Sequence, residues 1–391
     1  MQILPSHYQS AIQSLSKYNQ LNSVKVPSFH KSVPMVYANE TAVQEKSENL
    51  FKTVIEYLKA IPQDSKLFFK KNDPVYIPDL HGDFVHLITT LHRHNLLESD
   101  LKLKSDFKYI LLGDIYNRGK DSNVIDYWLN KQIERGIEFY RLIGNHELFF
   151  VTRKEDGQLL TVNARNHNPL FVPSNDIQID ILNGYKVTEE LLKNMKDGNL
   201  LAAYAALNTE INVPMLYTHS FVINEDLNKL LSDGSKDIFN FVEVLNERLK
   251  KVGKASYECF TDCKAKDKYD WKEINAPFAS DPFFNIRGRD ANGRHTSYLM
   301  RVTGLAEKPG VLSTNISDEL PSGVYQTVGH TMIFHFDLPK GFPDNGPIIM
   351  SNKNKNAFVQ FSDVGIGSYY KDDSFERHDV TLNKELSLLP S

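Results

Sequence analysis

Five short segments of the sequence carry side chains that bind divalent metal ions through nitrogen or oxygen. Each segment follows an apolar run that predicts a buried strand. The segments are Asp79-Leu80-His81-Gly82-Asp83, Gly113-Asp114-Ile115-Tyr116-Asn117-Arg118-Gly119, Gly144-Asn145-His146-Glu147, Thr218-His219-Ser220 and Val328-Gly329-His330-Thr331. Because the ends of neighbouring strands meet at one edge of a sheet, we expect these side chains to converge. They supply enough carboxylate, amide and imidazole groups to hold two divalent cations.

The elements that position these segments follow from the apolar runs and from helical spacing. The predicted strands before the five segments are Val75–Pro78, Tyr109–Leu112, Phe139–Ile143, Met215–Tyr217 and Tyr325–Val328. Helices are predicted at 43–60, from Phe84 after the first ligand loop, and over Ser122–Glu134 after the second. Alternation of strand, ligand loop and helix predicts a parallel or mixed sheet. One further strand is predicted at Phe358–Val364.

The domain organisation is predicted to be a loosely ordered lead-in over 1–45, with a short helix near 7–18, followed by one domain over 46–391. Two insertions interrupt the domain, at 152–206 and at 223–280. The first is predicted to be a loop over 152–187 and a helix over 188–206, and the second to be helical and highly charged. Insertions of this length near a site are lids or disordered decoration, and we favour a cap that covers the substrate.

In their order and spacing, the segments resemble the phosphoprotein phosphatase branch of the calcineurin-like metallophosphoesterases. The family pattern is GDxHG, GDxxDRG, GNHE and then two isolated histidines, and the resemblance covers roughly residues 73–366. Three ordered motifs that each follow a strand are much more specific than one GNHE alone. The resemblance implies an α/β (α+β) fold, a calcineurin-like β-sandwich of mixed sheets flanked by helices, with a helical and loop cap insertion.

The resemblance also implies two metal sites that share Asp114 as a bridging carboxylate. The other ligands would be Asp79 and His81 for the first ion, and Asn145, His219 and His330 for the second. Mixed nitrogen and oxygen ligands favour Mn²⁺, with Fe or Zn²⁺ as alternatives. Because the set contains no thiolate, a purely structural zinc is disfavoured.

The implied enzyme is a dimetal phosphomonoesterase that acts on phosphorylated protein, at Ser/Thr or Tyr, by in-line attack of a metal-bridging hydroxide. His146 resembles the general acid for the leaving group. Arg118 and Arg287 would bind the phosphate through their guanidinium groups. Arg289 is an alternative to Arg287 in this role. Asn145 and His146 would also bind the phosphate.

Several residues depart from the family pattern. Asn117 stands where the family has an aspartate that pairs with the residue matching His146, so the imidazolium should be less stabilised. Pro78 replaces a glycine, and Ser220-Phe221 replaces a Gly-Gly pair. Asp363 resembles the late aspartate of the family. These differences from eukaryotic sequences favour a bacterial protein, which acts in its own cell or is delivered into a host as an effector.

Two other functions compete with the protein phosphatase. One is hydrolysis of a phosphoanhydride, similar to the diadenosine tetraphosphate hydrolases that share these motifs. The other is a non-catalytic phosphatase-like binding module. Such a module would be expected to have lost a metal ligand, whereas all six ligand positions are filled in this sequence. A separate histidine group, His86, His92 and His94, is predicted to lie on an exposed helix face rather than to bind metal, and Cys259 and Cys263 to be free thiols.

The composition and net charge limit the classes of binding partner that we expect. A net charge of −4 gives no reason to expect nucleic-acid binding. No stretch approaches the roughly 20 apolar residues of a membrane span, and residues 1–18 lack the apolar run of a cleaved signal peptide. The expected location is therefore cytoplasmic, or a host cell reached without a cleaved signal. The sequence favours no particular oligomeric state.

Overall fold

The structure is a computed structural model. It describes residues 40–63, 74–117, 119, 121–157, 185–208, 213–231, 237–291, 293, 295–301, 319–330, 348–351, 354 and 356–362. The helix predicted near residues 7–18, most of the loop predicted at 152–187, and the residues Arg118 and Asp363 lie outside this part of the chain.

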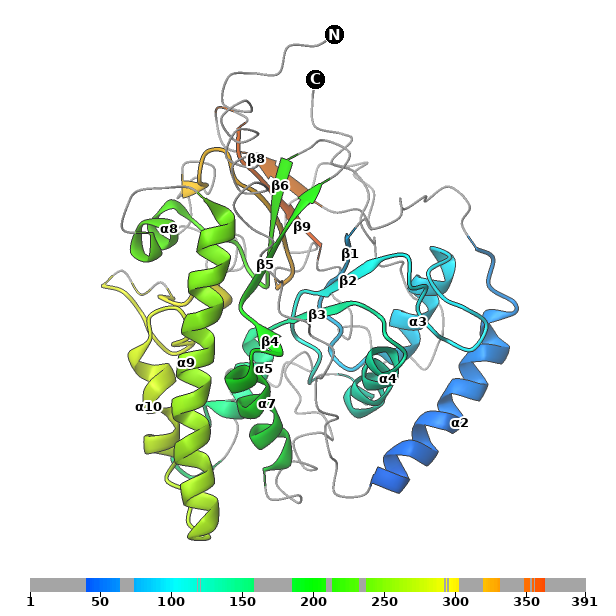
Figure 1. The fold of residues 1–391 in the computed structure, drawn as a ribbon, viewed down its shortest axis with the longest axis horizontal. Coiled ribbons are helices and arrows are strands. Elements are labelled where there is room, and N and C mark those ends of the chain that lie inside the picture. The colour runs from blue at the N-terminus through cyan, green and yellow to red at the C-terminus, as the bar shows by residue number, and fades with distance from the viewer. Residues whose placement is uncertain are drawn as a thin grey trace.

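Four parallel strands form the first sheet, in the order β1-β2-β3-β4 (Figure 1). They are β1 (Pro74–Ile77), β2 (Lys108–Leu111), β3 (Phe139–Leu142) and β4 (Leu200–Leu201). The helix α3 (Phe84–Arg93) connects β1 to β2, and α4 (Ser122–Glu134) connects β2 to β3. The first three strands and both helices confirm the predicted alternation of strand, ligand loop and helix.

The second sheet is mixed, in the order β5-β6-β7-β9-β8. Its strands are β5 (Ala203–Asn208), β6 (Val213–Thr218), β7 (Tyr325–Val328), β8 (Ile348–Ser351) and β9 (Phe358–Phe361). The three central strands β6, β7 and β9 are parallel, whereas β5 and β8 pair antiparallel at the edges. The strands predicted at 215–217, 325–328 and 358–364 are therefore confirmed, the last of them as far as Phe361.

A buried apolar layer lies between the two sheets. It comprises Tyr76, Ile110, Leu112, Tyr140, Leu142 and Leu201 from the first sheet and its strand ends, and Met215, Tyr217, Tyr325 and Phe358 from the second. The other face of the first sheet packs against helices, where Val75 and Leu111 join Phe84 and Trp128 in the main core. Two packed sheets flanked by helices confirm the predicted fold class.

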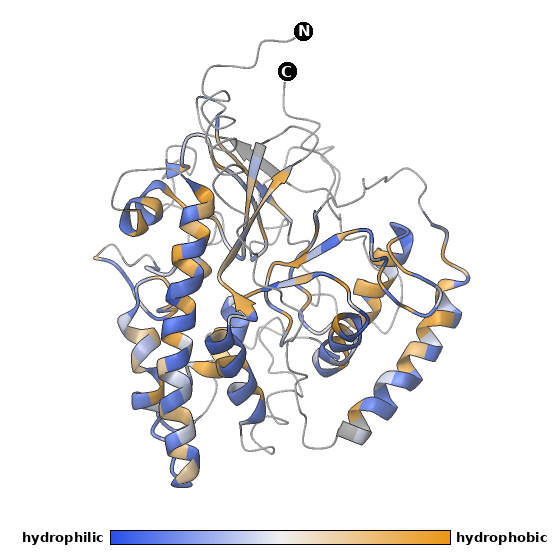
Figure 2. Cartoon of the chain, in the orientation of Figure 1, coloured by the Kyte–Doolittle hydropathy of each residue, from blue (hydrophilic) through white to orange (hydrophobic). Residues whose placement is uncertain are grey.

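Further helices cover two sides of the sandwich. On one side α5 (Asn145–Val151), α7 (Lys186–Asp197), α8 (Asn224–Leu230), α9 (Ile238–Ala265) and α10 (Trp271–Ser280) pack in one group (Figure 1). A short 3₁₀ helix, η3 (Tyr298–Met300), follows α10 in the chain. The long helix α9 packs against α7 and α10 and buries Phe241, Leu245 and Leu249, which are four residues apart. Figure 2 shows the resulting mixture of hydrophobic and hydrophilic residues along α9.

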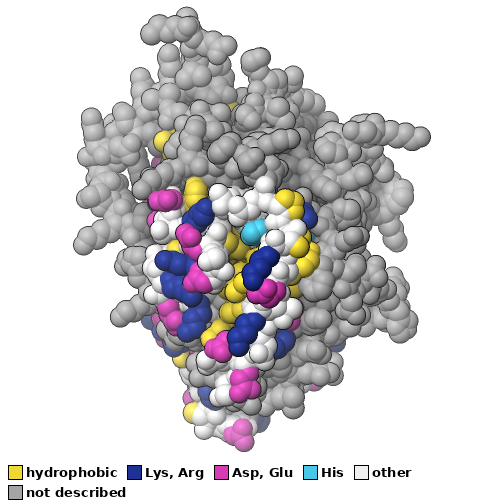
Figure 3. All heavy atoms as spheres, turned by 90° about the vertical axis from the view of Figure 1, so that its right-hand side faces the viewer, with side chains coloured by type: hydrophobic (Ala, Val, Ile, Leu, Met, Phe, Trp, Pro, Cys, Tyr) yellow, Lys and Arg dark blue, Asp and Glu magenta, His cyan; other side chains and the backbone are white. Residues whose placement is uncertain are grey.

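On the opposite side, α2 (Glu40–Leu58) packs against α3 and α4. Figure 3 shows that charged side chains of both signs gather beside hydrophobic ones on this face. The helix begins at Glu40, before the predicted domain start at residue 46. Because α3 is enclosed by its neighbours, His86 and His94 are only 8% and 7% exposed, so the predicted exposed histidine face is wrong for both.

The helix predicted over 188–206 is wrong in its second half. α7 ends at Asp197, and Gly198 follows with φ +76° and donates its N–H to carbonyls of the last helical turn. Glycine adopts this left-handed conformation without a Cβ penalty, so it ends the helix. The apolar residues after it become β4 and β5, which gain sheet hydrogen bonds and burial. Residues of the predicted cap thus belong to both sheets, and a substrate-covering role for 152–206 and 223–280 stays a prediction.

Two further observations concern the cysteines and the hydrophobicity of the helices. Cys259 and Cys263 are free thiols on α9, as predicted. None of the described helices has both the length and the apolar character that crossing a membrane would require. Cytoplasmic location and delivery into a host stay predictions.

Candidate metal centre

The strand registers bring the predicted ligand segments to one edge of the sandwich. In the first sheet Ile77 pairs with Leu111, so the loops that carry Asp79 and Asp114 leave adjacent strands at the same level. In the second sheet Thr218 pairs with Val328, and His219 and His330 follow these strand ends. Asn145 begins α5 directly after β3 and Gly144. The convergence predicted from the sequence is therefore present.

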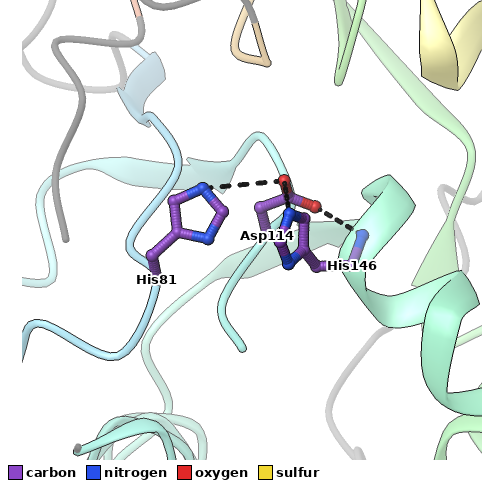
Figure 4. Close-up of side chains that lie close together, drawn as sticks. All are labelled: His81, Asp114 and His146. Carbon is purple, nitrogen blue, oxygen red and sulfur yellow. Dashed lines mark hydrogen bonds and ion pairs between the residues drawn. The ribbon is translucent and has the colours of Figure 1, made fainter. Parts of the chain in front are cut away.

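Asp114 lies at the centre of this buried set. Its Oδ2 is 3.8 Å from His81 Nε2 and 3.7 Å from His146 Nε2 (Figure 4). Its Oδ1 is 3.5 Å from His219 Nε2. Asp114 is thereby shared by two groups of candidate ligands, with His81 and His146 in one group and His219 and His330 in the other. A carboxylate between two groups of ligands has the position that a bridging ligand requires.

The remaining predicted ligands surround His219. Its Nε2 is 2.9 Å from Asn145 Oδ1 and 3.1 Å from His330 Nδ1. Asp79 accepts the backbone N–H of His330 at 3.0 and 3.1 Å, and its carboxylate oxygens lie 3.8 Å from His219 Nδ1 and 3.9 Å from His81 Nε2. All six predicted ligands thus lie in one cluster, and their division between two ions stays a prediction.

Two of the imidazoles have their tautomer fixed by a backbone carbonyl. His81 Nδ1 lies 3.2 Å from the Tyr116 carbonyl oxygen, and His219 Nδ1 lies 2.8 Å from that of Leu112. A carbonyl can only accept, so each Nδ1 carries the proton and donates it. In the neutral ring, Nε2 then offers a lone pair to the centre of the site, which is the arrangement that metal-binding histidines have in proteins.

Glu147 organises the site, although the sequence analysis gave it no role beyond its motif. Its carboxylate accepts the backbone N–H groups of Asp114, Ile115 and Gly144 at 2.8–2.9 Å. Burial, together with the nearby charge of Asp114, raises the pKa of Glu147 to about 7. This side chain ties the second ligand loop to the third, and its constant place in GNHE was the signal available in the sequence.

Glycine is required where backbones approach the ligands most closely. A Cβ on Gly329 would lie 2.1 Å from Asp79 Oδ1, and one on Gly144 would lie 2.1 Å from Asp114 Oδ1. Any side chain at either position would displace a predicted ligand. The glycines of the third and fifth segments therefore serve the packing of the site.

The backbone of the site is strained at several ligand positions. Four residues of the ligand segments adopt φ between +45° and +71°, namely His81, Asp114, Asn117 and His330. Side chains other than glycine rarely adopt this left-handed region, and such residues cluster at functional sites. The surrounding hydrogen bonds hold them there, including those from Leu80 and His81 N–H to the Asp114 carbonyl at 3.1 and 2.8 Å.

His146 and Asn117 form a buried pair. The Asn117 side-chain N–H donates to His146 Nδ1 at 2.9 Å, and the two residues are 8% and 7% exposed. This bond places the proton of a neutral His146 on Nε2, the atom that faces Asp114. The pairing expected from the sequence is present without a carboxylate, and the role of His146 as general acid stays a prediction.

Arg287 does not join the cluster in this structure. Its guanidinium donates to the carbonyl oxygens of Thr152 and Arg153 at 3.1 and 2.8 Å, just beyond the last residue of α5. A seven-residue helix is roughly 10 Å long, and Asn145 is at the other end of α5. The phosphate-clamping role of Arg287 stays a prediction, and Arg118 lies outside the described residues.

The donor set fits divalent cations. Neighbouring ligand atoms are 3.5–3.8 Å apart around Asp114, close to the separation of two ligands on one ion with bonds of about 2 Å. The donors are carboxylate, amide oxygen and imidazole, which suit Mn²⁺, Fe and Zn²⁺. A cation at this position would also compensate the charges of Asp79 and Asp114, which are both buried.

The sequence matches one family of known proteins. Residues 75–262 match the family model of the calcineurin-like phosphoesterases. The chain contains a calcineurin-like phosphoesterase domain. The match includes every predicted metal ligand except His330, which lies beyond it. No curated protein matches the sequence.

Among solved structures, several phosphatases are similar to this chain. The cold-active protein-tyrosine phosphatase of a psychrophile, Shewanella sp., has 17% identity and a TM-score of 0.41, and the match covers 80% of this chain and 76% of that one. A protein serine/threonine phosphatase from Saccharomyces cerevisiae has 13% identity and a TM-score of 0.36, with 82% and 77% covered. The phosphatase domain of the Legionella effector WipB has 17% identity and a TM-score of 0.26, with 70% and 82% covered.

Proposed function

We propose that this calcineurin-like phosphoesterase hydrolyses phosphate monoesters on proteins with two divalent metal ions. The observation that carries the proposal is the position of Asp114 between two groups of candidate ligands. His81 and His219, whose Nδ1 protons are committed to carbonyls, supply one nitrogen ligand to each group. Asp79, Asn145 and His330 complete the proposed set.

The chemistry divides between the ions and the side chains. Bound ions would neutralise charge on the phosphoryl oxygens and acidify the attacking water. His146 follows the ligand Asn145 and its Nε2 faces Asp114, so in its imidazolium form it could protonate the leaving alkoxide from Nε2 and be left as the neutral ring. Arg118 and Arg287 are proposed to bind the phosphoryl oxygens, for which Arg287 would have to release the carbonyls of Thr152 and Arg153.

The nature of the ion and of the substrate is part of the same proposal. The nitrogen and oxygen donors favour Mn²⁺ over Ca²⁺. A protein substrate is favoured by the motif order, which resembles the phosphoprotein phosphatase branch, and by the additional helices of 223–280. The loop departures at Pro78 and Ser220 favour a bacterial source, with action in the bacterium or, as an effector, in a host cell.

The test is a substrate panel with metal-stripped protein, with and without Mn²⁺. The panel contains para-nitrophenyl phosphate, phosphoserine, phosphothreonine and phosphotyrosine peptides, and diadenosine tetraphosphate. We expect Mn²⁺-dependent release of phosphate from the ester and from at least one peptide. Preference for the dinucleotide would favour the phosphoanhydride hydrolase instead, and no turnover of any compound would favour the binding module.

A further inference from the structure

Two imidazoles of the site donate to backbone carbonyls, and for His81 this carbonyl lies in a loop. His219 donates to the carbonyl of Leu112, whose own N–H bonds to Ile77 of the neighbouring strand β1. His81 donates instead to the carbonyl of Tyr116, which lies beyond the end of β2 in the ligand loop. The orientation of His81 therefore requires that this part of the loop be held in place by other contacts.

The loop around Tyr116 follows a strained path. Asp114 has φ +51° and Asn117 has φ +71°, so Tyr116 lies between two left-handed residues. Glu147 holds the backbone N–H groups of Asp114 and Ile115, and Gly82 N–H binds the Ile115 carbonyl at 2.8 Å. These bonds hold the loop as far as Ile115. The next residue is Tyr116, whose carbonyl accepts the His81 Nδ1 proton.

The side chain of Tyr116 supplies an anchor at that residue. Its hydroxyl donates to Asp126 Oδ2 at 2.5 Å, and Arg141 Nη2 donates to the other oxygen, Asp126 Oδ1, at 2.9 Å. Tyr116 is 1% exposed, Asp126 0% and Arg141 8%. The Tyr116 ring also packs against Phe150 of α5 at a centroid distance of 5.2 Å. Charge-assisted hydrogen bonds in a buried site hold their partners firmly.

We infer that Tyr116 is a positioning residue for the metal centre. Its side chain, held by the buried Asp126–Arg141 ion pair, fixes the carbonyl that accepts the His81 Nδ1 proton and so directs His81 Nε2 toward the ions. The inference rests on the proposed function, because it assumes that His81 is a metal ligand. The Tyr116 hydroxyl is bonded to Asp126, and its effect on the ions would be transmitted through His81.

The first experiment compares Mn²⁺ binding to metal-stripped parent and Tyr116→Phe proteins by calorimetric titration. The change removes the hydroxyl and keeps the ring against Phe150. Loss of an outer partner of a metal ligand weakens metal binding by about 10- to 100-fold, so we expect one of two Mn²⁺ sites to weaken by about 10-fold. The matched control is Tyr109→Phe, which removes another buried hydroxyl, one that donates to the Lys104 carbonyl at 2.9 Å.

A double-mutant cycle separates positioning from general loosening of the fold. If Tyr116 acts through His81, then Tyr116→Phe should leave the remaining Mn²⁺ binding within about twofold in a His81→Ala background. The Co²⁺-loaded proteins add a spectroscopic readout. The visible absorption of the Tyr116→Phe protein should differ from that of the parent, whereas the Tyr109→Phe spectrum should match it.

The outcomes distinguish this inference from the proposed function. Parental Mn²⁺ affinity and Co²⁺ absorption in Tyr116→Phe would overturn the inference, as would an equal loss in the His81→Ala background. If the parent binds two Mn²⁺ but turns over no phosphate ester, the proposed function fails while the positioning role of Tyr116 stands on the binding data. A parent that binds no metal would overturn both.

Discussion

At the scale of single residues, hydrogen bonds to neighbouring groups orient the side chains that are proposed to bind the metal ions. His81 and His219 donate Nδ1 protons to carbonyls, and Asp79 and Asp114 accept backbone N–H groups from His330 and His146. Each donor atom is thus oriented before an ion arrives, which lowers the entropic cost of binding. The ligand types could be predicted from the sequence, but these partners could not, because they belong to residues distant in the chain.

Exchange of Asn117 for the family's aspartate tests the buried pair. In Asn117→Asp, the carboxylate would accept a hydrogen bond from His146 Nδ1–H and stabilise the imidazolium, which raises its pKa. A general acid works only when protonated, so the upper limit of activity should move to higher pH. The pH–rate profile on para-nitrophenyl phosphate measures this, and a profile that matches the parent's would contradict it.

Close approach at Gly329 gives a second prediction. In Gly329→Ala the new methyl group would meet Asp79 Oδ1 at 2.1 Å, so Asp79 or the His330 backbone must move. We expect Mn²⁺ affinity to fall by about 10-fold or more. The control is Gly323→Ala, at φ +82° with no atom within 4 Å of the added group. It should cost about 1 kcal/mol of stability and leave metal affinity unchanged.

At the scale of elements, residue 202 links the two sheets, because β4 ends at Leu201 and β5 begins at Ala203. Asn246 of α9 secures this crossing. Its Oδ1 accepts the N–H groups of Ala202 and Ala203 at 2.8 and 3.1 Å, and its Nδ2 donates to the Ala203 carbonyl at 3.0 Å. A helix outside the motif region thereby stabilises the framework that carries the ligand loops.

Removal of this link should lower stability more than activity. Asn246→Ala leaves backbone groups of the crossing without their partner, and we expect a loss of about 1–3 kcal/mol in the free energy of unfolding. Urea denaturation measures the loss, with Asn240→Ala on the exposed side of α9 as the matched control. Stability equal to that of the control would show that the crossing does not depend on Asn246.

Prediction of elements succeeded where local pattern and burial agree. The helix at 122–134 and the strand at 325–328 have the bounds the sequence indicated. It failed at 198–206, where an apolar run can form a helix or a strand and the pairing with β3 and β6 decides. It also missed the buried Arg141–Asp126 pair, because no local pattern specifies a contact between a helix and a strand.

At the scale of the whole molecule, the sandwich places ligands from both sheets at one edge. Asp79 and Asp114 come from the first sheet, and His219 and His330 come from the second. Ions held between them would therefore connect the two sheets. Strand ends and motif order made this convergence predictable, whereas the left-handed backbone at His81 and His330 depends on the assembled loops.

If metal ions connect the two sheets, we expect metal binding to stabilise the fold. At an Mn²⁺ concentration 100-fold above the dissociation constant, each site should add about 3 kcal/mol to the free energy of unfolding. Thermal unfolding of metal-stripped protein, with and without Mn²⁺, measures the gain as a higher midpoint temperature. An unchanged midpoint would contradict a metal centre that joins the sheets.

The most direct test of the dimetal site is Mn²⁺ binding and hydrolysis of para-nitrophenyl phosphate on the same samples of parent and Asp114→Asn protein. The exposed Asp100→Asn change serves as control. We predict two bound Mn²⁺ and hydrolysis in the parent and the control, and a loss of more than roughly 100-fold in rate for Asp114→Asn. A parent that binds no Mn²⁺, or an Asp114→Asn protein that hydrolyses at the parental rate, would contradict the account.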